Sequence, residues 1–198
     1  MTLAEQSTGY FAGDSAPADR LWTREEYDRL VDLGFFNGER LELIEGRIYQ
    51  MSPLRVPHSV AVELVDRYLR RAFSQGHRIR VQLPFRSAEG SEPEPDLAVI
   101  AGDDPRASTE HPSTAVLIVE ISDTTLEHDR RKAAIYAGSG VQEYWIVNLV
   151  SRSLEVYRNA SRSENGTATY GDIKVLPERE RVSAVGGNVA VTVAELLP

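Results

Sequence analysis

The apolar run at residues 115–119 constrains the fold of this chain more than any other stretch. It reads "AVLIV" and continues directly into Glu120 and Ile121. Apolar and polar residues do not alternate along it, which is typical of a strand that is covered on both faces. We therefore expect a strand in the interior of the protein with a carboxylate at its end.

Two acids are expected at the ends of neighbouring buried strands. Burying Glu120 is costly unless the carboxylate is paired, hydrogen-bonded or bound to a metal. A second acid, Asp96, follows Pro95 and precedes the short apolar run "LAVI". Proline cannot donate a ladder hydrogen bond, so it belongs at the beginning of a strand. Asp96 is therefore predicted at the mouth of its strand.

A helix is expected after Glu120, running to about Ser139. It carries Asp129 and Lys132, which are three residues apart and so lie on one side of the helix. Two carboxylates can hold Mg²⁺ through hard oxygen ligands, and a nearby lysine can orient water or offset charge on a phosphate. This pattern favours a metal-dependent phosphodiesterase. Spacing alone fits equally well a structural ion pair from Glu120 to Arg130 or Lys132.

Length and composition indicate one domain. The chain has 198 residues, of which 41% are apolar, enough for a substantial core. We expect a single domain over residues 21–198, after a flexible tail at residues 1–20 that is rich in small and polar types. The tail lacks the features of a secretory signal, and no stretch approaches the length of a membrane span. The absence of cysteine excludes disulfides and zinc–thiolate sites, and fits a cytoplasmic protein.

The charge of the chain leaves the class of partner open. The formal net charge of −8 counts against nucleic acid, because domains that bind it are commonly basic. Arginine and histidine nevertheless crowd residues 67–86, and a second basic cluster covers residues 130–132. Solvated helix and strand faces are the simpler interpretation of such clusters. A basic groove in an otherwise acidic protein is the other interpretation.

The remaining pattern predicts further helices and strands and two more candidate residues. Glu42 shares one face of a predicted hairpin strand with Ile44, and spacing alone favours the solvent for that face. His58 falls in the first turn of a helix, where a single histidine is more often a hydrogen-bonding cap than a site residue. The expected elements are a helix at 23–33 that begins with a capping box of Thr23 and Glu26, a hairpin at 40–51 that turns at residues 45–46, and a helix at 58–74 with one wide apolar stripe. They continue with a half-exposed strand at 78–85 that has Gln82 on its polar face, strands at 143–148 and 154–158, and a polar loop at 159–170.

Several short motifs occur in an order that resembles the Uma-two family of restriction endonucleases, part of the PD-(D/E)XK nuclease superfamily. They are "ELIEG" in the hairpin, His58 at a helix start, "PEPD", "IVEIS", the helix residues Asp129, Lys132 and Tyr136, and "GVQEYWIV". The likeness covers residues 20–197. It implies a restriction-endonuclease-like α/β core, in which a central mixed β-sheet is flanked by helices, and a Mg²⁺ cofactor for which Mn²⁺ can substitute.

The resemblance also implies roles for single residues. Asp96 matches the acid of the "PD" motif and Glu120 the acid of the second motif, so both are implied metal ligands. The superfamily lysine lies two residues after the second acid, where this chain has Ser122. In the Uma-two family the lysine lies on the following helix, and Lys132 is the match. The family pattern features three further catalytic candidates: Glu42, His58 and Asp129.

Two functions are compatible with these observations. The resemblance implies an endonuclease that hydrolyses phosphodiester bonds in nucleic acid, with DNA favoured, and a homodimer would suit the cutting of two strands. The alternative is a module that kept the fold, lost catalysis and binds nucleic acid or a protein partner. The acidic net charge and Ser122 at the usual lysine position favour the alternative. Metal-dependent cleavage discriminates between the two functions.

Overall fold

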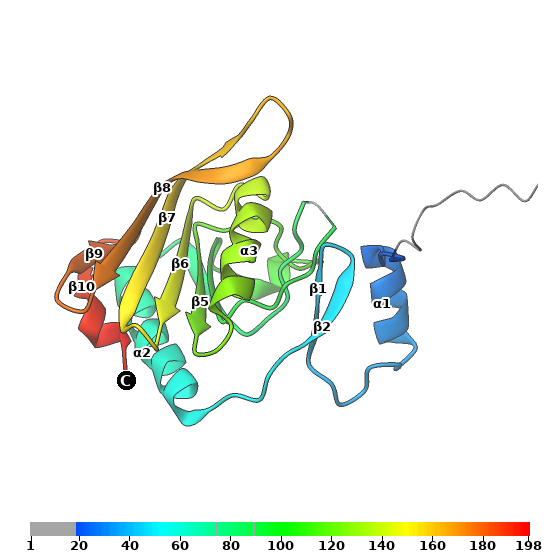
Figure 1. The fold of residues 1–198 in the computed structure, drawn as a ribbon, viewed down its shortest axis with the longest axis horizontal. Coiled ribbons are helices and arrows are strands. Elements are labelled where there is room, and N and C mark those ends of the chain that lie inside the picture. The colour runs from blue at the N-terminus through cyan, green and yellow to red at the C-terminus, as the bar shows by residue number, and fades with distance from the viewer. Residues whose placement is uncertain (1–18, 74, 89) are drawn as a thin grey trace, which may run out of the picture.

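A central sheet with helices on its two faces forms the body of the protein (Figure 1). The computed structural model describes residues 19–73, 75–88 and 90–198, so the predicted flexible tail at residues 1–20 lies outside the described residues except for its last two positions. Within these ranges, no helix is both long and apolar enough to cross a membrane. The helices are α1 (Arg24–Asp32), α2 (Val56–Ala72) and α3 (Leu126–Gly138), with 3₁₀ turns η1 (Pro105–Ala107) and η2 (Val193–Leu196). The strands are β1 (Leu41–Ile44), β2 (Arg47–Gln50), β3 (His77–Val81), β4 (Leu97–Ala101), β5 (Leu117–Ser122), β6 (Glu143–Asn148), β7 (Ser153–Arg162), β8 (Ala168–Pro177), β9 (Arg181–Ser183) and β10 (Ala190–Thr192).

The central sheet is mixed. In the described part of the chain it has six strands in the order β3-β4-β5-β6-β7-β8. β5 and β6 run parallel and are linked by α3, whereas all other neighbouring strands of this sheet are antiparallel. The pairs β1–β2 and β9–β10 form separate antiparallel hairpins. The prediction of an α/β domain with a central mixed sheet and flanking helices is confirmed.

β5 is the interior strand that the apolar run predicts, and all six of its residues are buried. Leu117, Val119 and Ile121 pack into the part of the core that includes α2. Ile118 belongs to the part that includes α3. Glu120 shares the face of Ile118, because side chains alternate along a strand, and it receives hydrogen bonds from α3. The alternation of side chains along β5 therefore places the Glu120 carboxylate on the sheet face that α3 covers.

The first helix and the first hairpin form one end of the molecule (Figure 1). The predicted capping box is present, since the Thr23 hydroxyl accepts a hydrogen bond from the backbone N–H of Glu26 and the Glu26 carboxylate accepts one from Thr23. The hairpin turns at residues 45–46, as predicted. Gly46 has φ +75°, and a Cβ atom there would lie 2.7 Å from the Cβ atom of Leu21. Both the backbone conformation and the space require glycine.

α2 occupies nearly the predicted span but begins and ends two residues earlier. Pro57 lies in its first turn, where the missing N–H costs nothing. The predicted apolar stripe packs on β4, β5 and the C-terminal segment, and its members Ala61, Val65 and Leu69 are fully buried. His58 consequently projects from the first turn of the helix, beside the beginning of β4.

The predicted strand at residues 78–85 is wrong in its second half. β3 ends at Val81 because Gln82 adopts φ +49°, which breaks the extended backbone. Alternation is lost beyond this point, so Leu83 is 45% exposed whereas Phe85 is 1% exposed. The amide side chain of Gln82 instead reaches Asp96. A tertiary contact thus overrides the alternating pattern.

The predicted polar loop at residues 159–170 is also wrong, because most of it is strand. β7 continues to Arg162 and β8 begins at Ala168, so the two form a long antiparallel hairpin. Tyr170 is buried and its hydroxyl donates to the carbonyl of Val141. The polar residues of this stretch face solvent, so its composition is that of a loop although its backbone is extended.

Candidate active site

A cleft of about 470 Å³ opens where β4 begins and β5 ends. Its walls come from β1, the segment between β2 and α2, the first turn of α2, and α3. The fold brings all the predicted site residues to this cleft, although they are far apart in the sequence. They are Glu42, His58, Asp96, Glu120, Asp129 and Lys132.

Asp96 is fixed by hydrogen bonds to both carboxylate oxygens. The backbone N–H of Ile121 donates to Oδ2 at 2.9 Å, and Nε2 of His58 lies 3.1 Å from the same oxygen. The side-chain amide of Gln82 donates to Oδ1 at 3.2 Å. Contact with the Asp96 carboxylate raises the pKa of His58, although burial of the imidazole acts in the opposite direction more strongly than any single contact. His58 thus orients Asp96 rather than capping α2.

Glu120 is deeply buried and accepts three hydrogen bonds. Nζ of Lys132 lies 3.1 Å from Oε1, and the Tyr136 hydroxyl donates to the same oxygen at 2.8 Å. The backbone N–H of Asp96 donates to Oε2 at 3.3 Å. Burial raises the pKa of Glu120 to about 8, because the cation of Lys132 offsets only part of the desolvation and the carboxylates of Asp129 and Asp96 add to it.

Glu42 corrects the expectation from spacing, which placed its side chain in solvent. It is 4% exposed, with His128 Nε2 2.8 Å from Oε1 and Lys132 Nζ 2.8 Å from Oε2. Burial by itself raises the pKa of this carboxyl, but these two partners outweigh it and lower the pKa to about 2. β1 is covered on both faces, as buried Leu43 shows, so strand alternation could not identify its inner face.

Lys132 is a buried cation between two carboxylates. It bridges Glu42 and Glu120, and these carboxylates raise its pKa although burial alone would lower it. Of the two ion pairs that the sequence left open, Glu120 therefore forms the one with Lys132. Arg130 pairs instead with Glu155, at 2.6 Å.

Asp129 and Lys132 face the same cleft, as their spacing of three residues predicts. The hydroxyl of Thr125 donates to Oδ2 of Asp129 at 2.7 Å. Burial raises the pKa of Asp129, and hydrogen bonds from Thr125 and Ser122 oppose the shift. Ser122 thus occupies the usual lysine position of the superfamily but contacts an acid on α3.

Three side chains that line the cleft or contact its residues were missed in the sequence. Gln82 was assigned to the polar face of a strand, yet its amide holds Asp96. His128 contacts Glu42 and packs against the ring of Tyr49, with the ring centroids 4.9 Å apart. The only available signal for His128 was its position four residues before Lys132, one helical turn away. No local pattern indicated Gln82 or Tyr49.

The cleft holds more buried carboxyl groups than buried ammonium groups. Glu42, Asp96, Glu120 and Asp129 are each between 3% and 6% exposed, and Lys132 is the buried cation among them. Such a site is stabilised by a further cation. Hard carboxylate oxygens suit Mg²⁺, which commonly uses one or two carboxylates and keeps several waters. Among the described residues, no group of three or more His, Cys, Asp or Glu side chains is arranged so that it could hold a metal ion. A Mg²⁺ ion held by one or two carboxylates and by waters does not need such a group.

Comparison with known families agrees with this geometry. A family model described as "Uma2: Putative restriction endonuclease" matches residues 24–191. The chain belongs to this family. The match spans the sheet, the three helices and every residue that lines the cleft. The Uma2 membership predicted from the short motifs is confirmed, and it supports a nuclease.

The fold of this Uma2 protein is also similar to that of a solved structure. That structure is described as "a putative nuclease belonging to DUF820" from Anabaena variabilis. The TM-score is 0.64 at 14% sequence identity, over 88% of this chain and 96% of the other. At such low identity the similarity shows the fold alone, and it confirms the nuclease-like core. A comparison with curated proteins finds no match.

Proposed function

We propose that this Uma2 protein is a Mg²⁺-dependent endonuclease that hydrolyses phosphodiester bonds of DNA in the cleft around Asp96 and Glu120. The observation that carries the proposal is the direct link between these acids. The backbone N–H of Asp96 donates to the Glu120 carboxylate, and the N–H of Ile121 donates back to the Asp96 carboxylate. Two carboxylates are thereby fixed side by side at adjacent strand ends, beside the cation of Lys132.

Asp96 and Glu120 would hold Mg²⁺ through their carboxylate oxygens. When bound, the metal polarises the scissile phosphate and lowers the pKa of the attacking water. Glu120 must lose its proton to become a ligand, and because its pKa is raised to about 8, metal binding is expected to strengthen as the pH rises toward 8. His58 and Gln82 orient Asp96 by contacting its two oxygens, a role typical of residues that surround metal ligands.

Lys132 is placed to act on the attacking water and the phosphate. Two of its three N–H donors are directed at Glu42 and Glu120. We assign the remaining donor to the nucleophile or to a phosphate oxygen, where positive charge stabilises the transition state. Glu42 and His128 hold the lysine in position. Asp129 supplies an auxiliary carboxylate on the α3 side of the cleft.

DNA is the proposed substrate because the family is described as a restriction endonuclease. Such an enzyme cuts two antiparallel strands, which are related by two-fold symmetry. We therefore propose that two copies of the chain act on one duplex as a homodimer. Size measurement by light scattering, with and without a DNA duplex, tests this part.

An inactive module that binds nucleic acid or a protein is the second candidate, and one observation favours it. Every carboxylate oxygen of Asp96 and Glu120 is already engaged by a protein donor. These protein donors satisfy both carboxylates without any metal, and the usual lysine position holds Ser122. Such a module would bind its partner equally well with and without Mg²⁺.

Calorimetric titration of Mg²⁺ and Mn²⁺ into wild type and Asp96→Asn tests the proposal most directly. We expect binding by the wild type and a loss of at least about tenfold in affinity in the variant. Asp172→Asn is the matched control, because it removes the same charge from a half-buried residue of β8 outside the cleft. Cleavage of plasmid DNA by wild type but not by Glu120→Gln then establishes the activity. A folded wild type that binds neither metal would support the inactive module instead.

A further inference from the structure

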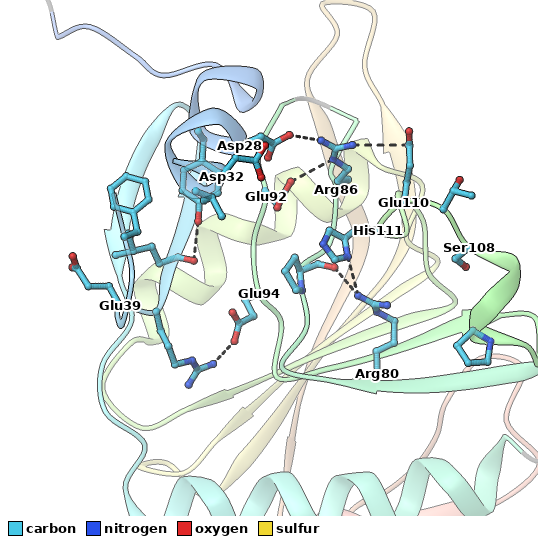
Figure 2. Close-up of a pocket in the computed structure, with 18 of the residues that line it drawn as sticks. Asp28, Asp32, Glu39, Arg80, Arg86, Glu92, Glu94, Ser108, Glu110 and His111 are labelled. Carbon is cyan, nitrogen blue, oxygen red and sulfur yellow. Dashed lines mark hydrogen bonds and ion pairs between the residues drawn. The ribbon is translucent and has the colours of Figure 1, made fainter. Parts of the chain in front are cut away.

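A second cleft, of about 740 Å³, lies between α1 and the edge strand β3 (Figure 2). Only a thin wall separates it from the candidate active site. Leu41 and Glu94 line the second cleft, whereas Glu42 and Asp96, one and two residues further along, line the first. The backbone nitrogen of Glu94 lies 3.5 Å from Oε2 of Glu42. A ligand that extends from the active site therefore has the second cleft as a neighbour.

Most charges in the second cleft compensate one another. Arg86 lies among three carboxylates, as Figure 2 shows, and Arg40 pairs with a fourth. These four acids are Asp28, Glu92 and Glu110 around Arg86, and Glu94 beside Arg40. Neither arginine is left with free charge to attract an anion.

Arg78 and Arg80 differ from these arginines. No carboxylate of the described residues forms an ion pair with either guanidinium within 4.0 Å. Arg78 donates to the hydroxyl of Ser108 at 3.0 Å, and Arg80 donates to the carbonyl of Pro84 at 3.0 Å. His111 Nδ1 lies 3.4 Å from Arg80. The neutral Ser108 hydroxyl and Pro84 carbonyl thus hold two cations in place and leave their charge uncompensated, in a chain with a net charge of −8.

A purely protective role explains these arginines less well. Charged side chains on an edge strand commonly prevent association, and fully solvated ones would serve that purpose. Here both arginines are partly buried, and their Nε atoms are buried without a hydrogen-bond partner. Burial lowers the pKa of Arg80, and the neighbouring charge of Arg78 lowers it further. Like charges held together at this cost are typical of an anion-binding site.

We infer that Arg78 and Arg80 form a phosphate-binding site for the nucleic-acid backbone, next to the phosphate that is cleaved. The inference rests on the proposed function and extends it to how the strand is held. Arginine suits this ligand because its planar guanidinium can bind a phosphate through two N–H donors. The acids of this cleft that have no ion pair among the described residues, Asp32 and Glu39, belong to the opposite wall at α1. Uncompensated negative charge therefore lies at the α1 wall and uncompensated positive charge at β3, so a polyanion binds on the β3 side of the cleft.

The position of the two arginines relative to the active site fits a continuous strand. Gln82, directly after β3, contacts Asp96. Arg80 and Arg78 precede it by two and four residues, opposite β4 residues that share the sheet face of Asp96. At about 3.3 Å per residue, they lie roughly 7 and 13 Å from Gln82 along the strand. These steps are comparable with those between successive nucleotides of an extended chain.

Fluorescence anisotropy with a fluorescein-labelled duplex and a labelled single strand tests the inference. EDTA is present, so that no cleavage occurs. We expect Arg80→Gln and Arg78→Gln each to weaken binding and to lower the slope of log Kd against log salt by about 1. Arg179→Gln is the matched control: it removes the same charge from an exposed residue of the β8–β9 turn and leaves the slope unchanged. Arg80→Lys keeps the charge, so it retains the slope and loses part of the affinity.

Thermal melts establish that each variant is folded. A titration of inorganic phosphate, followed by NMR of the arginine side chains, separates this inference from the proposed function. If Arg78→Gln, Arg80→Gln and Arg179→Gln all weakened oligonucleotide binding equally, this inference would be overturned and the proposed function would stand. Phosphate binding at Arg78 and Arg80 without oligonucleotide binding would assign the site to a free phosphorylated molecule and refute a nucleic-acid substrate. Binding of neither ligand by the wild type would overturn both.

Discussion

The backbone N–H of Asp96 lies 3.3 Å from the Glu120 carboxylate, so the two acids are joined through the main chain directly before β4. The peptide that follows Glu120 completes the exchange by donating to the Asp96 side chain. Because each bond uses a backbone donor, the carboxylates keep their positions without a ligand. The geometry required for metal binding is therefore built into the pairing of β4 and β5.

Replacement of Lys132 by methionine is expected to destabilise the protein by about 3 kcal/mol, because the buried Glu42 carboxylate, which is ionised at pH 7, would lose its buried cationic partner. Lys174→Met is the control, since Lys174 forms an exposed pair whose loss costs about 1 kcal/mol at most. Urea unfolding at pH 7 measures both. Equal stabilities of the two variants would mean that Glu42 is protonated or hydrated rather than ion-paired with Lys132.

Gln82→Ala is expected to weaken Mn²⁺ binding by about tenfold, because the amide orients Asp96 through its Oδ1 atom. Gln142→Ala is the matched control on an exposed residue outside the cleft. Calorimetric titration compares the two variants with the wild type. An unchanged affinity in Gln82→Ala, with the fold intact, would show that His58 and the Ile121 N–H suffice to position the carboxylate.

The stability of the metal-free protein is expected to fall as the pH rises toward 8. The pKa of Glu120 is raised to about 8 in the folded state, so its contribution is fully present below the unfolded pKa of about 4.5 and is lost through pH 8. Asp129, whose pKa is also raised by burial, acts in the same direction. Glu42 acts oppositely: its contribution is present above about pH 4.5 and is lost as the pH falls toward 2.

Urea unfolding of wild type and Glu120→Gln between pH 5 and 9, in EDTA, measures this effect. The neutral glutamine does not titrate, so the variant is expected to show a flatter profile. Saturating Mg²⁺ is expected to reverse the trend in the wild type, because the metal binds the ionised carboxylate. Superimposable pH profiles of the two proteins would exclude a raised pKa at Glu120.

Gly46→Ala is expected to cost more stability than Gly166→Ala. Both glycines have positive φ, +75° and +86°, so alanine is strained at either position by about 1–3 kcal/mol. At Gly46 the new methyl group would also meet Leu21 at 2.7 Å, whereas no atom lies within 4 Å at Gly166. Thermal unfolding gives the difference. Equal losses would show that residues 21–22 move aside at little cost.

The sequence predicted those features that depend on neighbouring residues. The capping box at Thr23, the hairpin turn at Gly46 and the uninterrupted apolar strand β5 are all local patterns, and all are present. The placement of Asp96 and Glu120 at strand ends follows from the same patterns. The position of Lys132 on the same helix side as Asp129 needs only the helical repeat. Local periodicity therefore indicated Asp96, Glu120, Asp129 and Lys132, whereas Glu42 and His58 became candidates only through the family resemblance.

Tertiary structure alone decided which polar side chains are buried and what they contact. Alternation along β1 could not show that Glu42 faces inward, because segments distant in sequence cover both of its faces. Gln82 leaves the strand conformation, and its amide contacts Asp96, which is 14 residues away in the sequence. Arg78 and Arg80 resemble any charged edge of a sheet until the fold pairs the nearby acids with other arginines. Burial and charge compensation depend on contacts between distant segments, which local sequence patterns do not contain.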